Sequence, residues 1–235
     1  MRKTADFLLD MLYPKKCPMC HEVLKDKKLL ICERCAGRIR PISGALCMKC
    51  GKPVKMEEEY CPVCRNGNRY FSEGRSIFPY GELWRQSLVR FKYYGCREYG
   101  DFYAKALSVY GRKYLERWKP QLLVPVPLHP SKKRMRGFNQ SAYLTEKLSV
   151  FTGTPWDDSL VIKIRRTRSQ KKLDAVQRRN NLRKAYRVNR KLSDVTVLVV
   201  DDVYTTGSTM EAMAMCLLEA GARDVYFLTV CAGRL

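Results

Sequence analysis

Two adjacent acids and a row of small hydroxyl residues stand together near the C-terminus, in the stretch VVDDVYTTGSTM (199–210). Small side chains let backbone N–H groups converge on an anion, and hydroxyls add further donors. A helix that begins near Thr209 would contribute the favourable field of its N-terminus. The stretch therefore predicts a phosphate site made by Thr205, Thr206, Gly207, Ser208 and Thr209.

The two acids, Asp201 and Asp202, follow a valine-rich run, VTVLVV (195–200), that is typical of a buried strand. Two carboxylates beside a phosphate would repel it unless they faced sugar hydroxyls or a divalent cation. The stretch lacks the glycine and lysine spacing of nucleotide triphosphatases and the G-x-G-x-x-G of dinucleotide folds. We therefore expect a phosphorylated ribose that is bound with a divalent metal.

Eight of the eleven cysteines form four C-x-x-C pairs in the N-terminal part of the chain. Two such pairs complete a tetrahedral four-sulfur shell around one zinc ion. Zinc can supply on the order of 10 kcal/mol of folding free energy to a segment with few large apolar side chains. The sequence predicts two structural zinc sites built from the pairs Cys17/Cys20, Cys32/Cys35, Cys47/Cys50 and Cys61/Cys64.

The spacing leaves the partners of each pair open. Sequential pairing, first with second and third with fourth, is the simpler expectation, and interleaved pairing is the alternative. His21 is adjacent to a pair and is a weaker candidate ligand, because cysteines already fill all eight positions. Redox-active dithiols are disfavoured, since the segment lacks the βαβ context of thioredoxin-like motifs. We expect Cys96, Cys216 and Cys231 to be ordinary thiols in a reducing compartment.

Apolar runs alternate with helical periodicity in the rest of the chain. Strands are expected at 122–126, 160–164, 195–200 and 225–231, and helices at 82–95, 98–118, 138–151 and 208–221. Strands separated by helices indicate an α/β fold, with a parallel twisted sheet that helices flank and ligands at the carboxyl ends of the strands. The expected units are an N-terminal helix (1–14), a double zinc ribbon (15–70) and the α/β domain (71–235).

The formal net charge is +22, which points to phosphates, nucleic acid or anionic surfaces as partners. Asp6 and Asp10 interrupt the N-terminal apolar residues, so residues 1–14 read as a short helix packed on the protein, with a membrane-surface role as the alternative. Apolar runs stay short of the roughly 18 residues that a membrane span needs. We expect a cytoplasmic protein.

The quoted C-terminal stretch resembles the signature loop of type I phosphoribosyltransferases, which bind phosphoribosyl pyrophosphate (PRPP). The four cysteine pairs, the stretch PVPLHPSKKRMRGFNQS (125–141) and a later pattern make the whole chain similar to the ComF family of competence-related proteins. That later pattern consists of Gln170, Leu173, Arg178, Asn181 and Ala185, with Tyr186 where the family pattern has phenylalanine. The resemblance implies a double zinc ribbon joined to a type I phosphoribosyltransferase domain.

Residue roles follow from the resemblance. It implies that residues 205–209 hold the 5′-phosphate of PRPP, that Asp201 and Asp202 engage the ribose hydroxyls as catalytic residues, and that Mg²⁺ accompanies the pyrophosphate. A second wall of the PRPP site, or alternatively a solvated basic turn, would come from Arg136, Gly137, Asn139 and Gln140. A mobile basic loop, or alternatively a merely solvated charge run, would contain Arg165, Arg166, Gln170, Lys171 and Arg178.

Three functions compete at this point. The first is a phosphoribosyltransferase with an unknown acceptor, for example an enzyme of salvage metabolism. The second is a single-stranded DNA-binding module of DNA uptake. The third is a scaffold that binds a helicase of the uptake machinery. The favoured combination is a PRPP-binding transferase domain joined to a zinc ribbon that serves DNA uptake. Base stacking on aromatic residues is a weaker prediction, for Tyr70, Phe71, Phe91, Tyr93 and Tyr94.

Overall fold

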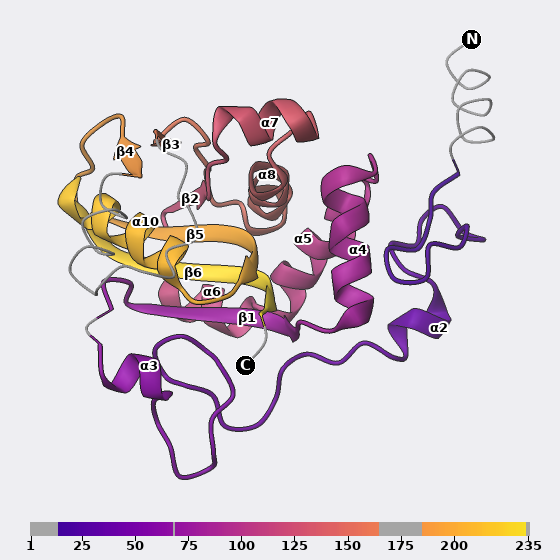
Figure 1. Ribbon diagram of the computed structural model, residues 1–235, viewed down its shortest axis with the longest axis horizontal. Helices are drawn as coiled ribbons and strands as arrows, with labels where there is room; N and C mark the ends of the chain where they lie inside the picture. Colours follow the sequence, from indigo (N-terminus) through magenta and orange to yellow (C-terminus); the bar gives the residue numbers. More distant parts are fainter. Residues whose placement is uncertain (1–13, 68, 165–184, 234–235) are drawn as a thin grey trace.

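The computed structural model describes residues 14–67, 69–164 and 185–233 (Figure 1). The strands are β1 (Glu73–Pro79), β2 (Leu122–Pro125), β3 (Val161–Lys163), β4 (Tyr186–Val188), β5 (Val195–Tyr204) and β6 (Ala222–Ala232). The helices are α2 (Glu33–Ala36), α3 (Pro62–Arg65), α4 (Glu82–Tyr93), α5 (Tyr99–Tyr110), α6 (Arg112–Trp118), α7 (Pro130–Arg136), α8 (Gln140–Thr152) and α10 (Ser208–Glu219). The expected N-terminal helix and basic loop lie outside the described residues, apart from Pro14.

Four strands form a parallel sheet in the order β1-β6-β5-β2. The central strands β5 and β6 are rich in valine and other apolar residues, as expected of strands that helices cover on both faces. Because all four strands run the same way, their carboxyl ends meet at one edge of the sheet. The predicted parallel α/β fold is therefore confirmed.

Two apolar cores cover the two faces of the sheet. On one face, Leu107 of α5 and Leu144 of α8 belong to the same core as Leu198 of β5. On the other face, Met213 of α10 belongs to the same core as Val199 of β5. Neighbouring residues of a strand point to opposite faces, so the valine-rich run of β5 supplies both cores.

The two cysteine-rich segments join different cores. Cys17 and Cys35 belong to the core that holds α5 and α8, whereas Cys47, Cys50 and Cys61 belong to the core that holds α10. Figure 1 shows the first segment beside α4 and the second below β1. The cysteine-rich part is thus packed into the α/β domain rather than attached through a linker.

Several expectations need correction. The strand expected at 160–164 forms as β3, but it pairs antiparallel with β4 and lies outside the parallel sheet. The long helical pattern before residue 118 divides into α5 and α6 at Gly111. Strand β5 continues to Tyr204, so the two acids lie within it rather than after it. In the part of the chain that the structure describes, no helix is long and apolar enough to cross a membrane.

The aromatic prediction is also partly wrong. Phe71 and Phe91 are 1% and 0% exposed and belong to the cores, so they are unavailable for base stacking. Tyr70, Tyr93 and Tyr94 keep exposed surface, and Tyr94 is the most accessible at 72%. Aromatic residues at helical spacing therefore served mainly for packing, as at Phe91 in α4.

Candidate functional site

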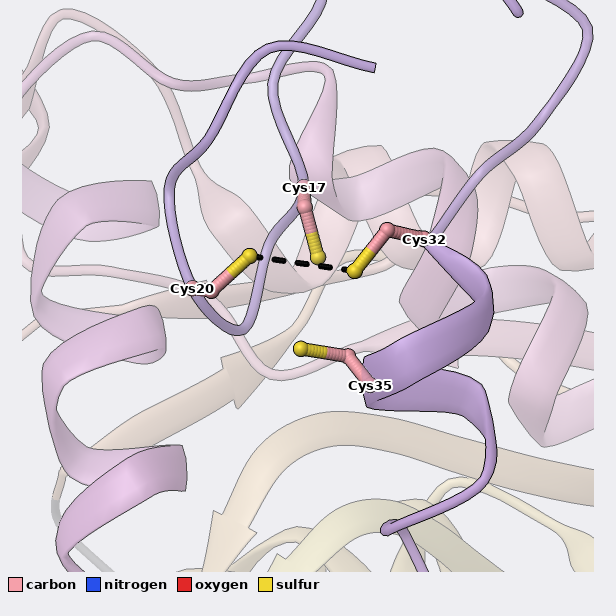
Figure 2. A group of neighbouring side chains, drawn as sticks. All are labelled: Cys17, Cys20, Cys32 and Cys35. Atoms are coloured by element: carbon pink, nitrogen blue, oxygen red, sulfur yellow. Dashed lines mark hydrogen bonds between the residues drawn. The ribbon is translucent and has the colours of Figure 1, made fainter. Parts of the chain in front are cut away.

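Four cysteines converge in the first cluster, from a loop and from the start of α2 (Figure 2). The sulfur atoms of Cys17, Cys20, Cys32 and Cys35 all lie within 4.8 Å of one another. The Sγ atoms of Cys20 and Cys32 are 3.8 Å apart. A tetrahedron with Zn–S bonds of about 2.3 Å has an edge of about 3.8 Å, so this sulfur set suits zinc.

The second cluster repeats this arrangement with Cys47, Cys50, Cys61 and Cys64. The Sγ atoms of Cys50 and Cys61 are 3.7 Å apart, again one tetrahedral edge. The sequential pairing predicted from the sequence is confirmed. His21 lies outside both clusters, and its Nδ1 atom instead contacts the Tyr99 hydroxyl.

Residues 205–209, which the sequence predicts to bind phosphate and which are called the phosphate loop below, follow β5 and include the first two residues of α10, at the carboxyl edge of the sheet. Gly207 is the N-cap residue of α10 and has φ of +82°, which glycine adopts without strain. A Cβ atom at this position would lie 2.5 Å from the Tyr204 hydroxyl oxygen. The Thr206 and Ser208 hydroxyls are 2.9 Å apart, and Thr206 is exposed. The loop thus presents hydroxyls and first-turn N–H groups at one place.

Asp201 is the acid nearer to solvent. Its Oδ1 atom accepts hydrogen bonds from the Ser141 hydroxyl at 2.5 Å and from the Asp202 backbone N–H at 2.9 Å. Ser141 lies in the first turn of α8, so this bond joins the start of α8 to the end of β5. Burial, followed by the charge of Asp202, raises the pKa of Asp201 to about 7.

Asp202 points to the opposite face of β5 and is only 4% exposed. Its Oδ2 atom forms an ion pair with the Lys92 ammonium of α4. Burial alone would raise the pKa of Asp202, but the Lys92 charge holds it below its ordinary value. Burial opposes the charge of Lys92, yet Asp202 raises the pKa of Lys92. Both groups are therefore charged at neutral pH, and the two adjacent acids have different surroundings.

Lys92 was missed in the sequence, although a signal exists. Trp84, Ser87, Leu88 and Phe91 form the buried face of α4, and Lys92 continues that face four residues after Leu88. A lysine at a core position of an amphipathic helix requires a buried counter-charge. The sequence could have predicted such a partner, but not that it would be Asp202.

The predicted second wall lies next to the acids. The Asn139 side chain caps α8 by accepting from the Ser141 N–H at 3.1 Å, and it donates to the Val126 carbonyl at 3.2 Å. Arg136 is oriented by hydrogen bonds to the Gln140 side chain at 2.9 Å and to the Tyr93 hydroxyl at 2.6 Å. Gln140 itself is buried. These residues fix the loop that joins α7 to α8.

The antiparallel strand pair β3–β4 contributes charge and aromatic surface near Asp201. The Lys163 ammonium donates to the Tyr186 hydroxyl at 3.2 Å and lies 5.1 Å from the centre of that ring. Burial, followed by the charge of Lys132, lowers the pKa of Lys163, whereas the Asp201 carboxylate acts in the opposite direction. A cavity of about 470 Å³ lies beside β3, lined in part by Phe138, Trp156 and Lys163.

A larger cavity, of about 970 Å³, lies between the first cysteine-rich segment and α4. Its lining is strongly basic, because four cationic side chains face one acidic residue, Glu98. The exposed ring of Tyr94 also lines it. The cationic residues are Lys15, Lys16, Arg85 and Arg90. No pattern in the sequence indicated that residues so far apart would meet here.

Two family models match the chain in separate regions. A double zinc ribbon domain matches residues 8–65, and a phosphoribosyl transferase domain matches residues 157–234. The first region contains both cysteine clusters. The second contains the acid pair and the phosphate loop, but it leaves out the wall formed by α7 and the start of α8.

Relatives match most of the chain. The DNA utilization protein YhgH of Salmonella typhimurium is 29% identical over 93% of this chain and 97% of its own length. Competence protein ComFC of Bacillus subtilis is 28% identical, with 81% of this chain and 79% of that protein covered. Competence protein F of Haemophilus influenzae is 27% identical, with coverages of 89% and 93%.

Solved structures overlap only partly with the chain. A purine phosphoribosyltransferase from Pyrococcus horikoshii covers 57% of this chain and 73% of its own, at 17% identity and a TM-score of 0.37. A hypoxanthine phosphoribosyl transferase from Trypanosoma cruzi covers 57% and 65%, at 14% identity and a TM-score of 0.38. The domain assignment rests on the matched family model and on the parallel sheet described above.

Proposed function

Because this chain belongs to the ComF/YhgH family, with a double zinc ribbon and a phosphoribosyltransferase domain, we propose that it binds PRPP at the phosphate loop. The observation that carries the proposal is the hydrogen bond between Ser141 and Asp201. It brings the start of α8, the acid pair and the phosphate loop to one edge of the sheet, where ligands of such sheets bind.

The two acids have different roles in this proposal. Asp201 accepts hydrogen bonds from the ribose hydroxyls, because it lies at the surface of the site and because Lys92 forms its ion pair with Asp202 instead. Asp202 is the buried counter-ion of Lys92 and holds α4 against the end of β5. This refines the expectation that both acids engage the ribose. The 5′-phosphate lies on residues 205–209, at the N-terminus of α10.

The pyrophosphate lies toward the second wall. Arg136 supplies a cation there, and its stacking on Tyr93, with 4.6 Å between the guanidinium carbon and the ring centre, limits its movement. Mg²⁺ supplies charge neutralisation of the pyrophosphate when PRPP is bound. The carboxylate of Asp201 is the kind of oxygen ligand that Mg²⁺ prefers, so the residues present suit that ion.

The reaction that fits this site is transfer of the phosphoribosyl group. The bond between the anomeric carbon and the pyrophosphate oxygen breaks, a bond from an acceptor to that carbon forms, and pyrophosphate leaves with the bonding electrons. Arg136 stabilises the negative charge on the leaving group. The cavity beside β3 has room for a small acceptor and aromatic surface, from Phe138 and Trp156, on which a planar one can pack.

Calorimetric titrations with PRPP, ribose 5-phosphate and pyrophosphate test the proposal. We expect PRPP to bind more tightly than either fragment, because only PRPP reaches both walls, and ribose 5-phosphate to compete with it. Arg136→Met should weaken pyrophosphate binding at least about tenfold, the loss of one charge-assisted bidentate contact, and leave ribose 5-phosphate binding unchanged. Binding of PRPP that ribose 5-phosphate does not displace would contradict the assignment of the phosphate loop.

Single-stranded DNA is a second proposed ligand, and the basic cavity beside α4 favours it. Its four cationic side chains match a phosphate backbone, and the exposed ring of Tyr94 offers a surface for base stacking. The names of the relatives, a DNA utilization protein and competence proteins, point the same way. The net charge of +22 adds to the attraction. A helicase partner of the uptake machinery stays a prediction.

The charge-reversed variant Lys15→Glu, Arg90→Glu tests the DNA proposal. We expect its affinity for a thymidine 20-mer to fall at least about tenfold, with a shallower dependence on salt, because fewer phosphates are neutralised. The control variant Lys113→Glu, Lys191→Glu makes the same change of net charge at exposed positions outside the cavity. Equal losses in the two variants would show that binding depends on net charge and not on this cavity.

A further inference from the structure

The second ribbon, residues 47–64 with their four-cysteine cluster, lies against the strand that leads into the phosphate loop. Tyr204, the last residue of β5, is 2% exposed and shares a core with Cys47, Cys50 and Cys61. The Lys52 ammonium, in the turn after Cys50, lies 5.8 Å from the centre of the Tyr204 ring. The ribbon and Tyr204 are therefore immediate neighbours.

Tyr204 in turn supports the phosphate loop. The space above its hydroxyl is so tight that a Cβ atom at Gly207 would lie 2.5 Å from the hydroxyl oxygen. On the other side, its ring stacks on Phe227 with 4.6 Å between ring centres and an angle of 12°. The phenol is thus held between β6 and the loop backbone. A displacement of Tyr204 would move Gly207, the N-cap residue of α10.

A second connection reaches the first turn of α10. Glu211 accepts a hydrogen bond from the Tyr70 backbone N–H at 3.1 Å and pairs with the Arg69 guanidinium at 3.5 Å. The side chains of Glu211 and Arg69 are each 14% exposed. Residues 69 and 70 follow shortly after Cys64, so the position of the ribbon is transmitted to α10 here as well.

The ribbon is also fixed to the sheet at its first cysteine pair. The Gly74 N–H of β1 donates to the Lys49 carbonyl at 2.8 Å. The Arg75 guanidinium donates to the carbonyls of Cys47 and Met48 at 3.4 and 3.3 Å. The turn that carries Cys47 and Cys50 is therefore braced from β1, and the Met48 N–H donates to the Glu59 carbonyl at 2.8 Å, which joins this turn to the segment before Cys61.

The first ribbon, residues 17–35 with their own cluster, packs elsewhere. Its Pro18 carbonyl accepts from the Ser87 hydroxyl of α4, and Cys17 and Cys35 belong to the core on the opposite face of the sheet. The two clusters thus form a natural comparison within one chain. The second cluster packs beside Tyr204, which precedes the phosphate loop, and the first cluster packs against α4.

We infer that metal binding at Cys47, Cys50, Cys61 and Cys64 shapes the phosphate loop through Tyr204 and Glu211, so that zinc at this cluster and a sugar phosphate at the loop strengthen each other's binding. The inference rests on the proposed function, since it concerns the same loop. Coupling between two sites is reciprocal, so each ligand must raise the affinity of the other by the same factor. Zinc at the first cluster lacks this route.

The variants Cys61→Ser and Cys32→Ser provide the test. Each residue is the third ligand of its cluster and the N-cap residue of a four-residue helix, α3 or α2. We expect Cys61→Ser to weaken binding of ribose 5-phosphate at least about tenfold, and Cys32→Ser to change it less than about twofold. Zinc content and the unfolding transition are measured on both proteins. Equal effects of the two variants, or none from Cys61→Ser, would overturn the inference.

The zinc-loaded wild-type chain gives a second measurement that needs no substitution. Saturating ribose 5-phosphate should slow the release of one of the two zinc ions to a coloured chelator by about tenfold and leave the other unchanged. In Tyr204→Phe, which keeps the ring but removes the hydroxyl beneath Gly207, this protection should be lost. Equal protection of both ions, or of neither, in a chain that binds ribose 5-phosphate would overturn the coupling. A wild-type chain that fails to bind ribose 5-phosphate would instead remove the proposed function.

Discussion

Asp201→Asn is expected to weaken PRPP binding at least about 100-fold. The substitution keeps the size of the side chain but removes the charge that accepts two ribose hydroxyls. Hydrogen bonds to a charged group contribute about 1.5–3 kcal/mol each, and about 1.4 kcal/mol corresponds to a factor of ten. Calorimetric titration of the variant with PRPP and Mg²⁺ measures the loss. An affinity within about threefold of the wild type would remove Asp201 from the site.

The same variant should be more stable than the wild type at neutral pH. Because the pKa of Asp201 is raised to about 7, the folded chain retains a proton between about pH 4 and pH 7 that the unfolded chain has lost. The wild type therefore loses stability as the pH rises through this window. We expect the free energy of unfolding of Asp201→Asn, relative to that of the wild type, to rise by about 1 kcal/mol or more from pH 6 to pH 8. Denaturant unfolding measures it, and the exposed control Asp158→Asn should not show this rise.

Asp202→Asn separates the two acids. It leaves the buried Lys92 ammonium without its counter-charge, and breaking a buried ion pair costs about 3–5 kcal/mol. This variant should therefore lose stability where Asp201→Asn gains it. If Asp202→Asn were as stable as the wild type, the ion pair would not have the structural role given to it here.

Removal of metal is expected to have the largest effect on the fold. Structural zinc contributes roughly 10–16 kcal/mol in isolated zinc-finger peptides, and both cores of this chain include cysteines of the clusters. Chelation should therefore lower the unfolding temperature of the whole chain and not only loosen the ribbons. Thermal unfolding with zinc content measured in parallel, before and after chelation, tests this. An unchanged unfolding temperature after both ions are lost would contradict it.

Sequence patterns predicted the parts of the fold that are determined by residues close together in the chain. The valine-rich run of β5, the helix that follows the phosphate loop and the C-x-x-C pairs each carry their own pattern. Strand β1 was missed because EGRSIFP contains a charged residue, Arg75, near its centre. The Arg75 guanidinium can be buried in the strand because Glu73 forms an ion pair with it at 2.5 Å and because backbone carbonyls of the second ribbon accept hydrogen bonds from it. Such compensation depends on tertiary contacts.

The candidate site was predictable in its residue types but less so in its connections. The phosphate loop and the acids are consecutive in the sequence, so their proximity was certain. Lys92 lies more than one hundred residues before Asp202, and the contact between Tyr204 and the second ribbon joins segments that are still farther apart in the sequence. Residues separated in this way meet only through the packing of α4 and of the ribbon on the sheet. Because the contact with Lys92 was not foreseen, the sequence analysis assigned the same role to Asp201 and Asp202.

A phosphorus NMR titration of PRPP with Mg²⁺ and the zinc-loaded chain tests the central claim most directly. It observes the 5′-phosphate and the pyrophosphate of one ligand separately. We expect both sets of signals to shift or broaden with the wild type, the 5′-phosphate through the phosphate loop and the pyrophosphate through the wall that holds Arg136. Free pyrophosphate appearing over time would add turnover to binding. PRPP signals that stay unchanged beside a folded, zinc-loaded chain would contradict the account.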